Sequence, residues 1–310
     1  MKTNRIEHPR LVAIETTNRC NAKCEFCPNN RMSRDRLVMD DELFEKIIDD
    51  CRSFPLGAIE PFLNGEPFVD PRIMDRLLLI RQRLPKTRLR LYTNGYGLTP
   101  KRIDGLLGLG VDHLYVSLNT LDPEAYRRIM GLDLERTLSN LAYLTEPQRK
   151  PRVARKVTFR MTRTDETTLK EQEDFIEYCR RLGVRSFIVG LFNYKGAIPS
   201  HLPVPPYPCE HITRIDVLSS GIVTLCCMDH EGEYAWGDAR KDSILDIYNG
   251  PVALRYRTLH RQGRRHEADP CGHCNVFWPS LERVSPLRKA QFAVQIASYF
   301  LRFWPTGKRA

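Results

Sequence analysis

Apolar residues between residue 11 and about residue 192 follow two alternating patterns. Short runs rich in Val, Ile, Leu and Tyr are separated by longer segments in which apolar residues recur at helical spacing. The first pattern is typical of strands and the second of amphipathic helices, so their alternation predicts consecutive βα units around a parallel sheet. Six strands are expected: Leu11–Thr17, Ala58–Leu63, Arg88–Thr93, His113–Leu118, Val157–Met161 and Ser186–Leu191.

The helices between these strands have recognisable starting points. The start at Asp122 is the clearest, because Pro123 suits the first helical position and Glu124 places an acid where the helix dipole favours it. The sequence therefore predicts an α/β fold over residues 1–198. The helices are expected to begin near Asp40, Pro71, Thr99, Asp122 and Thr168.

The composition of the chain changes after the sixth predicted strand. Prolines crowd residues 199–208, which excludes a helix and predicts an extended linker. Residues 209–277 contain a β-hairpin with Ser220 and Gly221 at its turn, a short helix near Ile244–Tyr248, and a closing Cys-Gly-His-Cys. A segment of this size is too small to fold on its own core, so a bound metal or cluster is expected to stabilise it.

Residues 278–310 form a basic, apolar tail. We expect it to pack against the barrel; contact with a membrane surface or a partner is the alternative, because apolar residues with nearby Arg and Lys suit an interface. Its apolar residues are Phe292, Ile296, Tyr299, Phe300 and Phe303, with Arg302 and Lys308 nearby.

Composition narrows the class of protein. At 310 residues and 42% hydrophobic content, the chain is long enough for one large α/β domain with a small appendage. The net charge of +10 is scattered and no basic block is interleaved with aromatics, so a solvated basic surface is expected and no nucleic-acid partner. Ten cysteines in a chain without a signal peptide or spanning segment predict a cytoplasmic protein whose thiolates bind metal.

Three of the cysteines stand close together directly after the first predicted strand. Cys20, Cys24 and Cys27 are separated by three and then two residues. Four thiolates would close a [4Fe–4S] cluster, whereas three leave one iron open for a ligand. A zinc site is the alternative, but zinc prefers closed tetrahedral sets and no fourth ligand lies close by.

The CxxxCxxC motif, with Phe26 before its last cysteine, resembles the radical S-adenosylmethionine (radical SAM) superfamily. The resemblance implies a partial (β/α)6, TIM-like barrel. It further implies an enzyme that reductively cleaves S-adenosylmethionine to a 5′-deoxyadenosyl radical, which takes a hydrogen atom from the substrate.

Four further segments extend the resemblance along the barrel, each at the end of a predicted strand or on it. Asn64-Gly65-Glu66-Pro67 is similar to the family's GGEP segment, which implies that Glu66 accepts the cofactor's ammonium group. Thr93 and Asn94, then Ser117 and Asn119, follow where the family contacts the rest of the cofactor; turn or strand-end chemistry is the alternative. Arg160 resembles a position that approaches the cofactor's carboxylate, and the alternative is a barrel-lining arginine paired to a carboxylate.

The later cysteines resemble the SPASM extension in its shortened form, the twitch domain. The resemblance implies a second, auxiliary [4Fe–4S] cluster; a structural zinc site is the alternative. The sequence leaves open which member of the adjacent pair is a ligand, because neighbours on a strand point to opposite faces. The spare member is either a hydrogen-atom donor in an epimerase or a buried small residue. The candidate ligands are Cys209, Cys226, Cys227, Cys271 and Cys274, whereas Cys51 and Cys179 are expected in the core.

The resemblance also suggests a reaction. Relatives with one auxiliary cluster include an aminocyclitol dehydrogenase and an epimerase, so we expect oxidation or epimerisation at a carbinol carbon of a sugar, aminocyclitol or similar small molecule. A flavodoxin- or ferredoxin-type protein would donate electrons. Candidates for the catalytic base are Arg160, Asp229, His230 and His211.

Two other functions remain as alternatives. One is a maturase that cross-links or epimerises a precursor peptide, against which the first strand begins only about ten residues into the chain, leaving no room for a leader-binding domain. The other is a non-catalytic iron–sulfur electron carrier or scaffold, which would have no use for a cofactor pocket.

Overall fold

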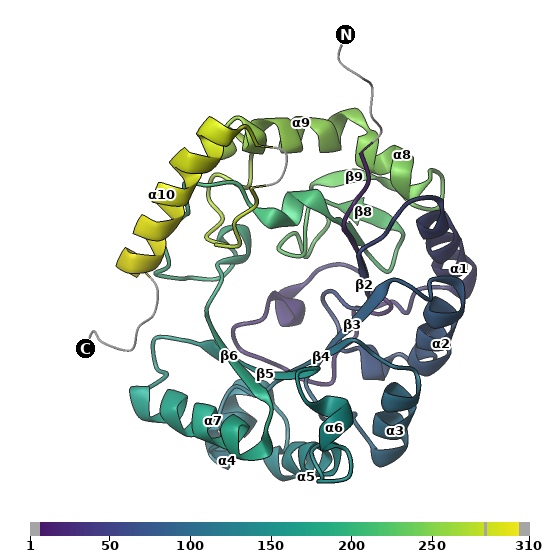
Figure 1. The fold of residues 1–310 in the computed structure, drawn as a ribbon, viewed down its shortest axis with the longest axis vertical. Coiled ribbons are helices and arrows are strands. Elements are labelled where there is room, and N and C mark those ends of the chain that lie inside the picture. Colours follow the sequence, from purple (N-terminus) through teal and green to yellow (C-terminus); the bar gives the residue numbers. More distant parts are fainter. Residues whose placement is uncertain (1–6, 282–283, 304–310) are drawn as a thin grey trace.

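The parallel strands form the inner layer of the molecule and the helices surround them (Figure 1). The computed structural model describes residues 7–281 and 284–303, and in them nine strands form one sheet in the order β6-β5-β4-β3-β2-β1-β7-β8-β9. Strands β1 to β6 pair in parallel, as predicted. They are β1 (Leu11–Ile14), β2 (Ala58–Glu60), β3 (Arg88–Thr93), β4 (His113–Ser117), β5 (Val157–Arg163) and β6 (Arg185–Gly190).

The predicted helix starts are confirmed by capping hydrogen bonds. Asp40, Thr99, Asp122 and Thr168 each accept a backbone N–H of the following first turn, and Thr168 forms a capping box with Glu171. The second helix begins two residues later than expected, at Ile73. These helices are α1 (Asp41–Asp50), α2 (Ile73–Arg83), α3 (Pro100–Gly108), α4 (Pro123–Met130) and α7 (Leu169–Leu182).

The connection between β4 and β5 holds more than the one helix predicted there. Gly131 ends α4 with φ of 66°, a conformation that glycine adopts without strain, and Asp133 caps a new helix two residues later. The additional helices are α5 (Leu134–Leu144) and α6 (Lys150–Val153).

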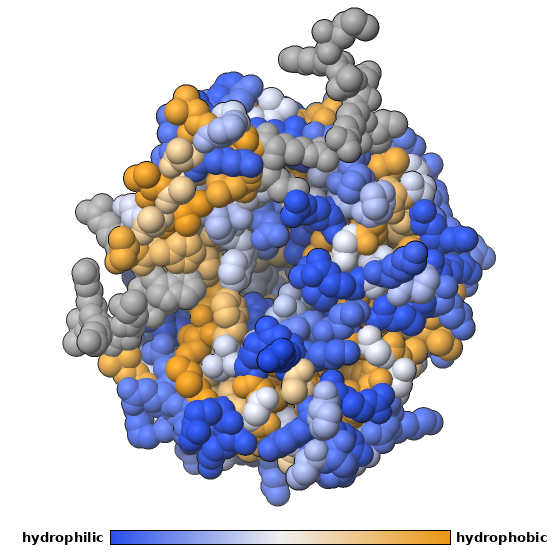
Figure 2. Space-filling model, in the orientation of Figure 1, coloured by the Kyte–Doolittle hydropathy of each residue, from blue (hydrophilic) through white to orange (hydrophobic). Residues whose placement is uncertain are grey.

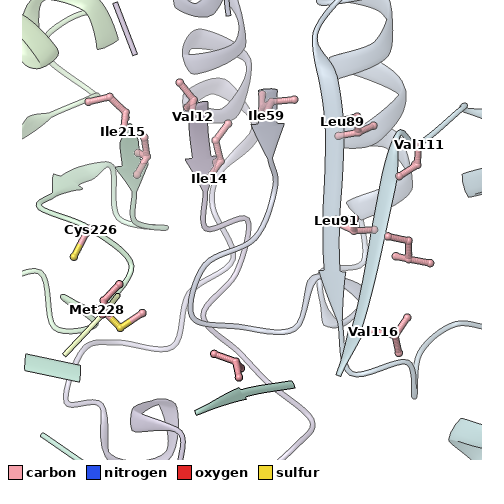
Figure 3. Close-up of a cluster of buried hydrophobic side chains, with 14 of the residues drawn as sticks. Val12, Ile14, Ile59, Leu89, Leu91, Val111, Val116, Ile215, Cys226 and Met228 are labelled. Carbon is pink, nitrogen blue, oxygen red and sulfur yellow. The ribbon is translucent and has the colours of Figure 1, made fainter. Parts of the chain in front are cut away.

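Side chains alternate between the two faces of each strand. Leu89 and Leu91 on β3 point outward and are fully buried with Val12, Ile14 and Ile59 in the core under the helices (Figure 3). The intervening residues Arg90 and Tyr92 instead point inward and line a cavity. The inner face of the sheet is thus polar and aromatic where the outer face is aliphatic.

The segment from Cys209 continues the same sheet. Strand β7 (Ile215–Val217) pairs in parallel with β1, and β8 (Ile222–Thr224) and β9 (Ala235–Asp238) follow antiparallel. The hairpin predicted around Ser220 and Gly221 is β7–β8, and the short helix is α8 (Ile244–Asn249). Helix α9 (Pro251–Arg261), which follows, is absent from the sequence-based expectation.

The tail forms a long helix, α10 (Pro286–Phe303), of which one face packs against the rest of the protein. Phe292 and Tyr299 are buried, while Leu287, Val294 and Leu301 are exposed along its outer face, where Figure 2 shows apolar residues gathered. Among the described helices, none combines the length and the apolar content needed to span a bilayer. The predicted tail residue Lys308 lies outside the described residues, as do the side chains of Arg302 and Phe303.

Candidate active site

A cavity of about 480 Å³ lies inside the barrel, bordered by the loops that follow β1 to β4 and by the segment from Glu210 to Met228. This volume suits a cofactor or a small-molecule substrate. The structure brings to its wall most of the residues predicted from the sequence, with Pro67 outside its lining in the turn Pro67–Val69. Those on the wall are Cys20, Cys24, Phe26, Cys27, Asn64, Gly65, Glu66, Thr93, Asn94, Ser117, Asn119, Arg160 and Cys227.

The loop after β1 brings its three cysteines to the wall of one cavity. The Cys27 N–H donates to the Cys24 carbonyl over 3.0 Å, and the Ala22 N–H donates to the Cys20 sulfur over 3.4 Å. Burial raises the pKa of all three thiols, that of Cys20 to about 12, and each neighbouring thiolate would raise it further. A cation must therefore replace the thiol protons before these sulfurs become ligands.

The buried Asn29 and the exposed Arg36 form a polar pair that supports this loop, and sequence reasoning missed it. Arg36 donates to the side-chain oxygen of Asn29 over 3.0 Å, and Asn29 donates to the carbonyls of Asn18 and Asn64. The positive charge of Arg36 lowers the pKa of Cys20 and Cys27, which partly offsets the effect of burial. No spacing rule singles out an arginine nine residues beyond the motif, so only the fold reveals this contact.

The Gly65-Glu66 turn fits tightly against the cysteine loop. A side chain at Gly65 would overlap the carbonyl oxygen of Thr17 and lie 2.8 Å from that of Arg19. The buried Glu66 carboxylate accepts hydrogen bonds from the Thr93 hydroxyl and the Asn94 N–H, both over 2.7 Å. Burial nonetheless raises the pKa of Glu66 to about 7, and these hydrogen bonds act in the opposite direction. An ammonium group placed here would favour the ionised form.

The asparagines at the ends of β3 and β4 are themselves held in position. Asn94 donates to the side chain of Asn21 in the cysteine loop over 2.8 Å. Asn119 accepts the Thr162 N–H over 2.9 Å and contacts the Met130 sulfur. The ends of neighbouring strands thus form one connected polar rim around the cysteines.

Arg160 lies lower in the barrel, among aromatic rings. Its guanidinium is 5.3 Å from the ring centre of Tyr92 and 5.8 Å from that of Phe187, and forms no hydrogen bond or ion pair with another side chain of the described residues. The alternative of a barrel arginine paired to a carboxylate is therefore not what the structure shows. Its charge remains available to an anionic or carbonyl group in the cavity.

The later cysteines converge from three separated segments. Electrostatic interactions link Cys226 to Cys271 and Cys274, and Cys209 to Cys274, and burial raises the pKa of the Cys209 thiol to about 11. Cys227 points the other way, onto the cavity wall, with its sulfur 3.4 Å from Nδ1 of His211. No three Cys, His, Asp or Glu side chains of the described residues converge on a single-ion site.

An arginine that the sequence did not suggest organises the last two of these cysteines. Arg265 is buried and donates to the carbonyls of Cys274 over 2.7 Å, Cys271 over 3.1 Å and Val276 over 3.3 Å. One guanidinium thus fixes the path of the Cys-Gly-His-Cys turn.

Comparison with known proteins agrees with this geometry. Residues 14–162 match the model of the radical SAM superfamily, and residues 209–275 match that of the SPASM iron–sulfur cluster-binding domain. The chain is also 31% identical over 303 residues to the tungsten-containing aldehyde ferredoxin oxidoreductase cofactor-modifying protein of Pyrococcus furiosus, which covers 89% of this chain and 80% of that protein. The chain belongs to the radical SAM superfamily.

Two other similarities accompany this membership. This radical SAM protein is 23% identical over 273 residues to the S-adenosyl-L-methionine-dependent 2-deoxy-scyllo-inosamine dehydrogenase of Niallia circulans, covering 86% of this chain and 92% of that one. Its fold is similar to the crystal structure of BtrN in complex with AdoMet and 2-DOIA, with a TM-score of 0.63, 20% identity, and 89% and 97% of the two chains covered. The α/β partial barrel with a C-terminal hairpin region is thereby confirmed.

The radical SAM protein thus uses an iron–sulfur cluster and S-adenosylmethionine, with an auxiliary iron–sulfur cluster in its SPASM region. The donor set fits both clusters, because one group of thiols faces the cavity and another is buried behind it. The remaining cysteines, Cys51 and Cys179, are buried in the core as expected.

Two base candidates lie behind the cavity wall. Asp229 is fully buried, and its carboxylate accepts the Tyr234 N–H and the Thr224 hydroxyl and pairs with Lys195. It therefore anchors a turn, and neither it nor the buried His230 is among the lining residues, whereas His211 and Arg160 are.

Proposed function

We propose that this radical SAM enzyme removes a hydrogen atom from a carbinol carbon of a sugar, aminocyclitol or similarly polar small molecule, oxidising or epimerising that carbon. The observation that carries the proposal is the cavity itself. One part of its wall carries Cys20, Cys24 and Cys27, another part carries Cys227 and His211, and the charged side chains of Glu60, Arg90 and Arg160 line the same cavity. Two similar proteins are named for modifying a cofactor and for dehydrogenating 2-deoxy-scyllo-inosamine, which supports a small-molecule substrate.

The cofactor side would be held by residues of the loops after β1 to β4. Cys20, Cys24 and Cys27 would bind a [4Fe–4S] cluster through three thiolates, and Glu66 would accept the ammonium group of S-adenosylmethionine. Bound there, cluster and cofactor supply a 5′-deoxyadenosyl radical when an electron arrives from a flavodoxin- or ferredoxin-type donor. The residues of the cavity wall would fix the position of the substrate beside the cofactor.

The auxiliary side would use Cys226 as the fourth ligand beside Cys209, Cys271 and Cys274. Electrostatic interactions link Cys226 to Cys271 and Cys274 but Cys227 only to Cys209 among these cysteines, and Cys227 also faces the cavity, which supports this choice. Cys227 would then be a free thiol in reach of the substrate. Burial raises its pKa to about 12, so it keeps its proton and is suited to return a hydrogen atom in an epimerisation.

After its hydrogen atom is removed, a carbinol radical must lose one electron and one proton to become a carbonyl. The auxiliary cluster would accept the electron, and the proton needs an acceptor on the cavity wall. His211 lines the cavity, and burial together with the charges of Arg214 and Arg265 holds its pKa well below the usual range. The lowered pKa keeps the imidazole neutral and also makes it a weaker base, so His211 is favoured as the proton acceptor by its place on the cavity wall, with Arg160 placed to stabilise the oxygen as it loses its proton.

Anaerobic assays of the reconstituted enzyme test the proposal. With dithionite, S-adenosylmethionine and 2-deoxy-scyllo-inosamine as the probe, we expect 5′-deoxyadenosine and an oxidised or inverted product in comparable amounts. A deuterium label on the reacting carbinol carbon should appear in 5′-deoxyadenosine. Absence of 5′-deoxyadenosine under strong reduction would favour an electron carrier, and cleavage without label transfer from the probe would exclude this substrate.

A further inference from the structure

The loop after β6 has an unusual backbone. Tyr194 and Lys195 have φ of 45° and 64°, followed by Gly196 at 94°. For residues other than glycine this conformation costs of order 1–3 kcal/mol each and persists only when the surroundings impose it. Something must therefore hold residues 193–196 in place.

Two anchors hold the loop, one on each side of Tyr194. Asn193 exchanges hydrogen bonds with Asn275, its N–H donating over 2.8 Å, and its amide donates to the His273 carbonyl over 2.7 Å. Lys195 is buried, pairs with Asp229, and donates to Glu233 over 3.0 Å.

Both anchors belong to segments that carry the auxiliary cysteines. His273 and Asn275 flank Cys274, and Asp229 follows Cys226 and Cys227 by two to three residues. The placement of this loop is therefore tied to the folding of the auxiliary region at two points.

The loop held by these two anchors places Tyr194 at the cavity. Its side chain lines the same cavity as Cys24, Cys27, Cys227 and Arg160. Burial raises the pKa of its phenol, which keeps the hydroxyl protonated. Tyr194 is partly buried, and within the described residues its hydroxyl has no hydrogen-bond partner, so the phenol is free to bond a ligand in the cavity.

We propose that Tyr194 is a catalytic residue whose phenol donates a hydrogen bond to a hydroxyl or carbonyl oxygen of the substrate beside the reacting carbon, and that the auxiliary segments set its position through Asn193 and Lys195. This inference rests on the proposed function, because the substrate must lie in the same cavity. It gives the auxiliary region a role in positioning the substrate, in addition to holding its cluster.

Tyr194→Phe tests the contact in the holoenzyme with 2-deoxy-scyllo-inosamine as the probe. We expect product formed per 5′-deoxyadenosine to fall about tenfold, because a directing hydrogen bond is lost, while cofactor cleavage stays within about threefold of the wild type. Tyr143→Phe, at a half-buried tyrosine whose hydroxyl donates to Asp104 outside the cavity, is the matched control and should change neither. Equal product ratios in Tyr194→Phe and wild type would overturn the contact, and a wild type that leaves the probe unchanged would overturn it together with the proposed function.

Hydrogen exchange tests the anchoring without any substrate. In Lys195→Met holoenzyme, amides of residues 193–198 should exchange at least about tenfold faster than in the wild type, with the rest of the barrel unchanged. Lys170→Met removes an exposed pair with Asp174 and should leave this loop unchanged, as should Tyr194→Phe. Unaltered exchange in Lys195→Met would overturn the positioning claim, whatever the activity assays show.

Discussion

The two cysteine-bearing regions differ in how accessible their cysteines are and in how far apart these cysteines lie in the sequence. In the loop after β1, three cysteines within eight residues face a cavity, and each is partly accessible. In the SPASM region, Cys209, Cys226, Cys271 and Cys274 come from segments up to 62 residues apart and are all buried. An accessible set with three thiolates suits a cluster that must bind a ligand, whereas a buried set of four suits one that only passes electrons.

The difference also shows how each region is stabilised. The first loop is fixed by local contacts, such as that of Cys27 with Cys24, and by its fit against Gly65. The second depends on long-range donors, above all Arg265. Loss of one ligand should therefore affect function in the first region and folding as well as function in the second.

The largest effects are expected from replacing one cysteine in each region, and they should differ between the two regions. Cys24→Ser should reduce formation of 5′-deoxyadenosine to background, because two thiolates no longer hold the cleavage cluster. Cys271→Ser should keep cofactor cleavage but lose the product, and each variant should retain about half of the iron of the wild type. Iron analysis and paramagnetic resonance measure this, and loss of all iron from either variant would mean that the two regions do not bind clusters independently.

Replacing Cys226 and Cys227 one at a time tests which of them is a ligand in the SPASM region. Cys226→Ser should lose the auxiliary iron, because Cys226 is the member linked to Cys271 and Cys274. Cys227→Ser should keep both clusters, since its sulfur faces His211 and the cavity. The opposite iron contents would reverse the assignment. If Cys227 returns a hydrogen atom, the Cys227→Ser variant should no longer form the inverted product in deuterated solvent. The probe should instead accumulate unreacted or oxidised.

The sequence predicts the first region far better than the second. Strands β1 to β6 lie within a few residues of their predicted positions, because buried apolar runs and capping residues are local signals. The spacing of Cys20, Cys24 and Cys27 is local too. No sequence motif predicts the contacts of Arg36, Arg265 and Tyr194, because these contacts exist only in the folded chain.

The choice between Cys226 and Cys227 shows the same limit. A strand places neighbours on opposite faces, but which face meets Cys271 depends on the packing of a segment 44 residues away. The extra helix α5 is a different case, because the sequence does carry local signals for it. Gly131 is a helix stop signal and Asp133 a helix start signal.

A smaller effect is expected from the buried arginine of the SPASM region. Arg265→Met leaves the carbonyls of Cys271, Cys274 and Val276 without their donor, which should lower the free energy of unfolding by about 3 kcal/mol. Arg264→Met removes an exposed pair with Glu267 and an exposed hydrogen bond to Gln262, and should cost less than about 1 kcal/mol. Anaerobic urea unfolding of the holoprotein compares them; equal midpoints would show that the cysteine turn does not depend on Arg265.

The smallest expected effect concerns Glu66 and acts on the cofactor side alone. Its pKa is raised to about 7, so in the cofactor-free protein the folded state binds more protons than the unfolded state between about pH 4.5 and 7, and stability due to this group falls as the pH rises through that window. Binding of an ammonium group requires the carboxylate, so affinity for S-adenosylmethionine should rise up to about tenfold per pH unit on approaching pH 7 and level off above it. Equilibrium dialysis from pH 5.5 to 8 measures this.

Two variants act as controls for this prediction. Thr93→Val, which removes a hydrogen bond that lowers the pKa of Glu66, should move the midpoint of the pH dependence upward. Glu66→Gln should weaken binding of S-adenosylmethionine and abolish this pH dependence. A wild-type affinity that is flat across the range would show that Glu66 is not the acceptor of the ammonium group.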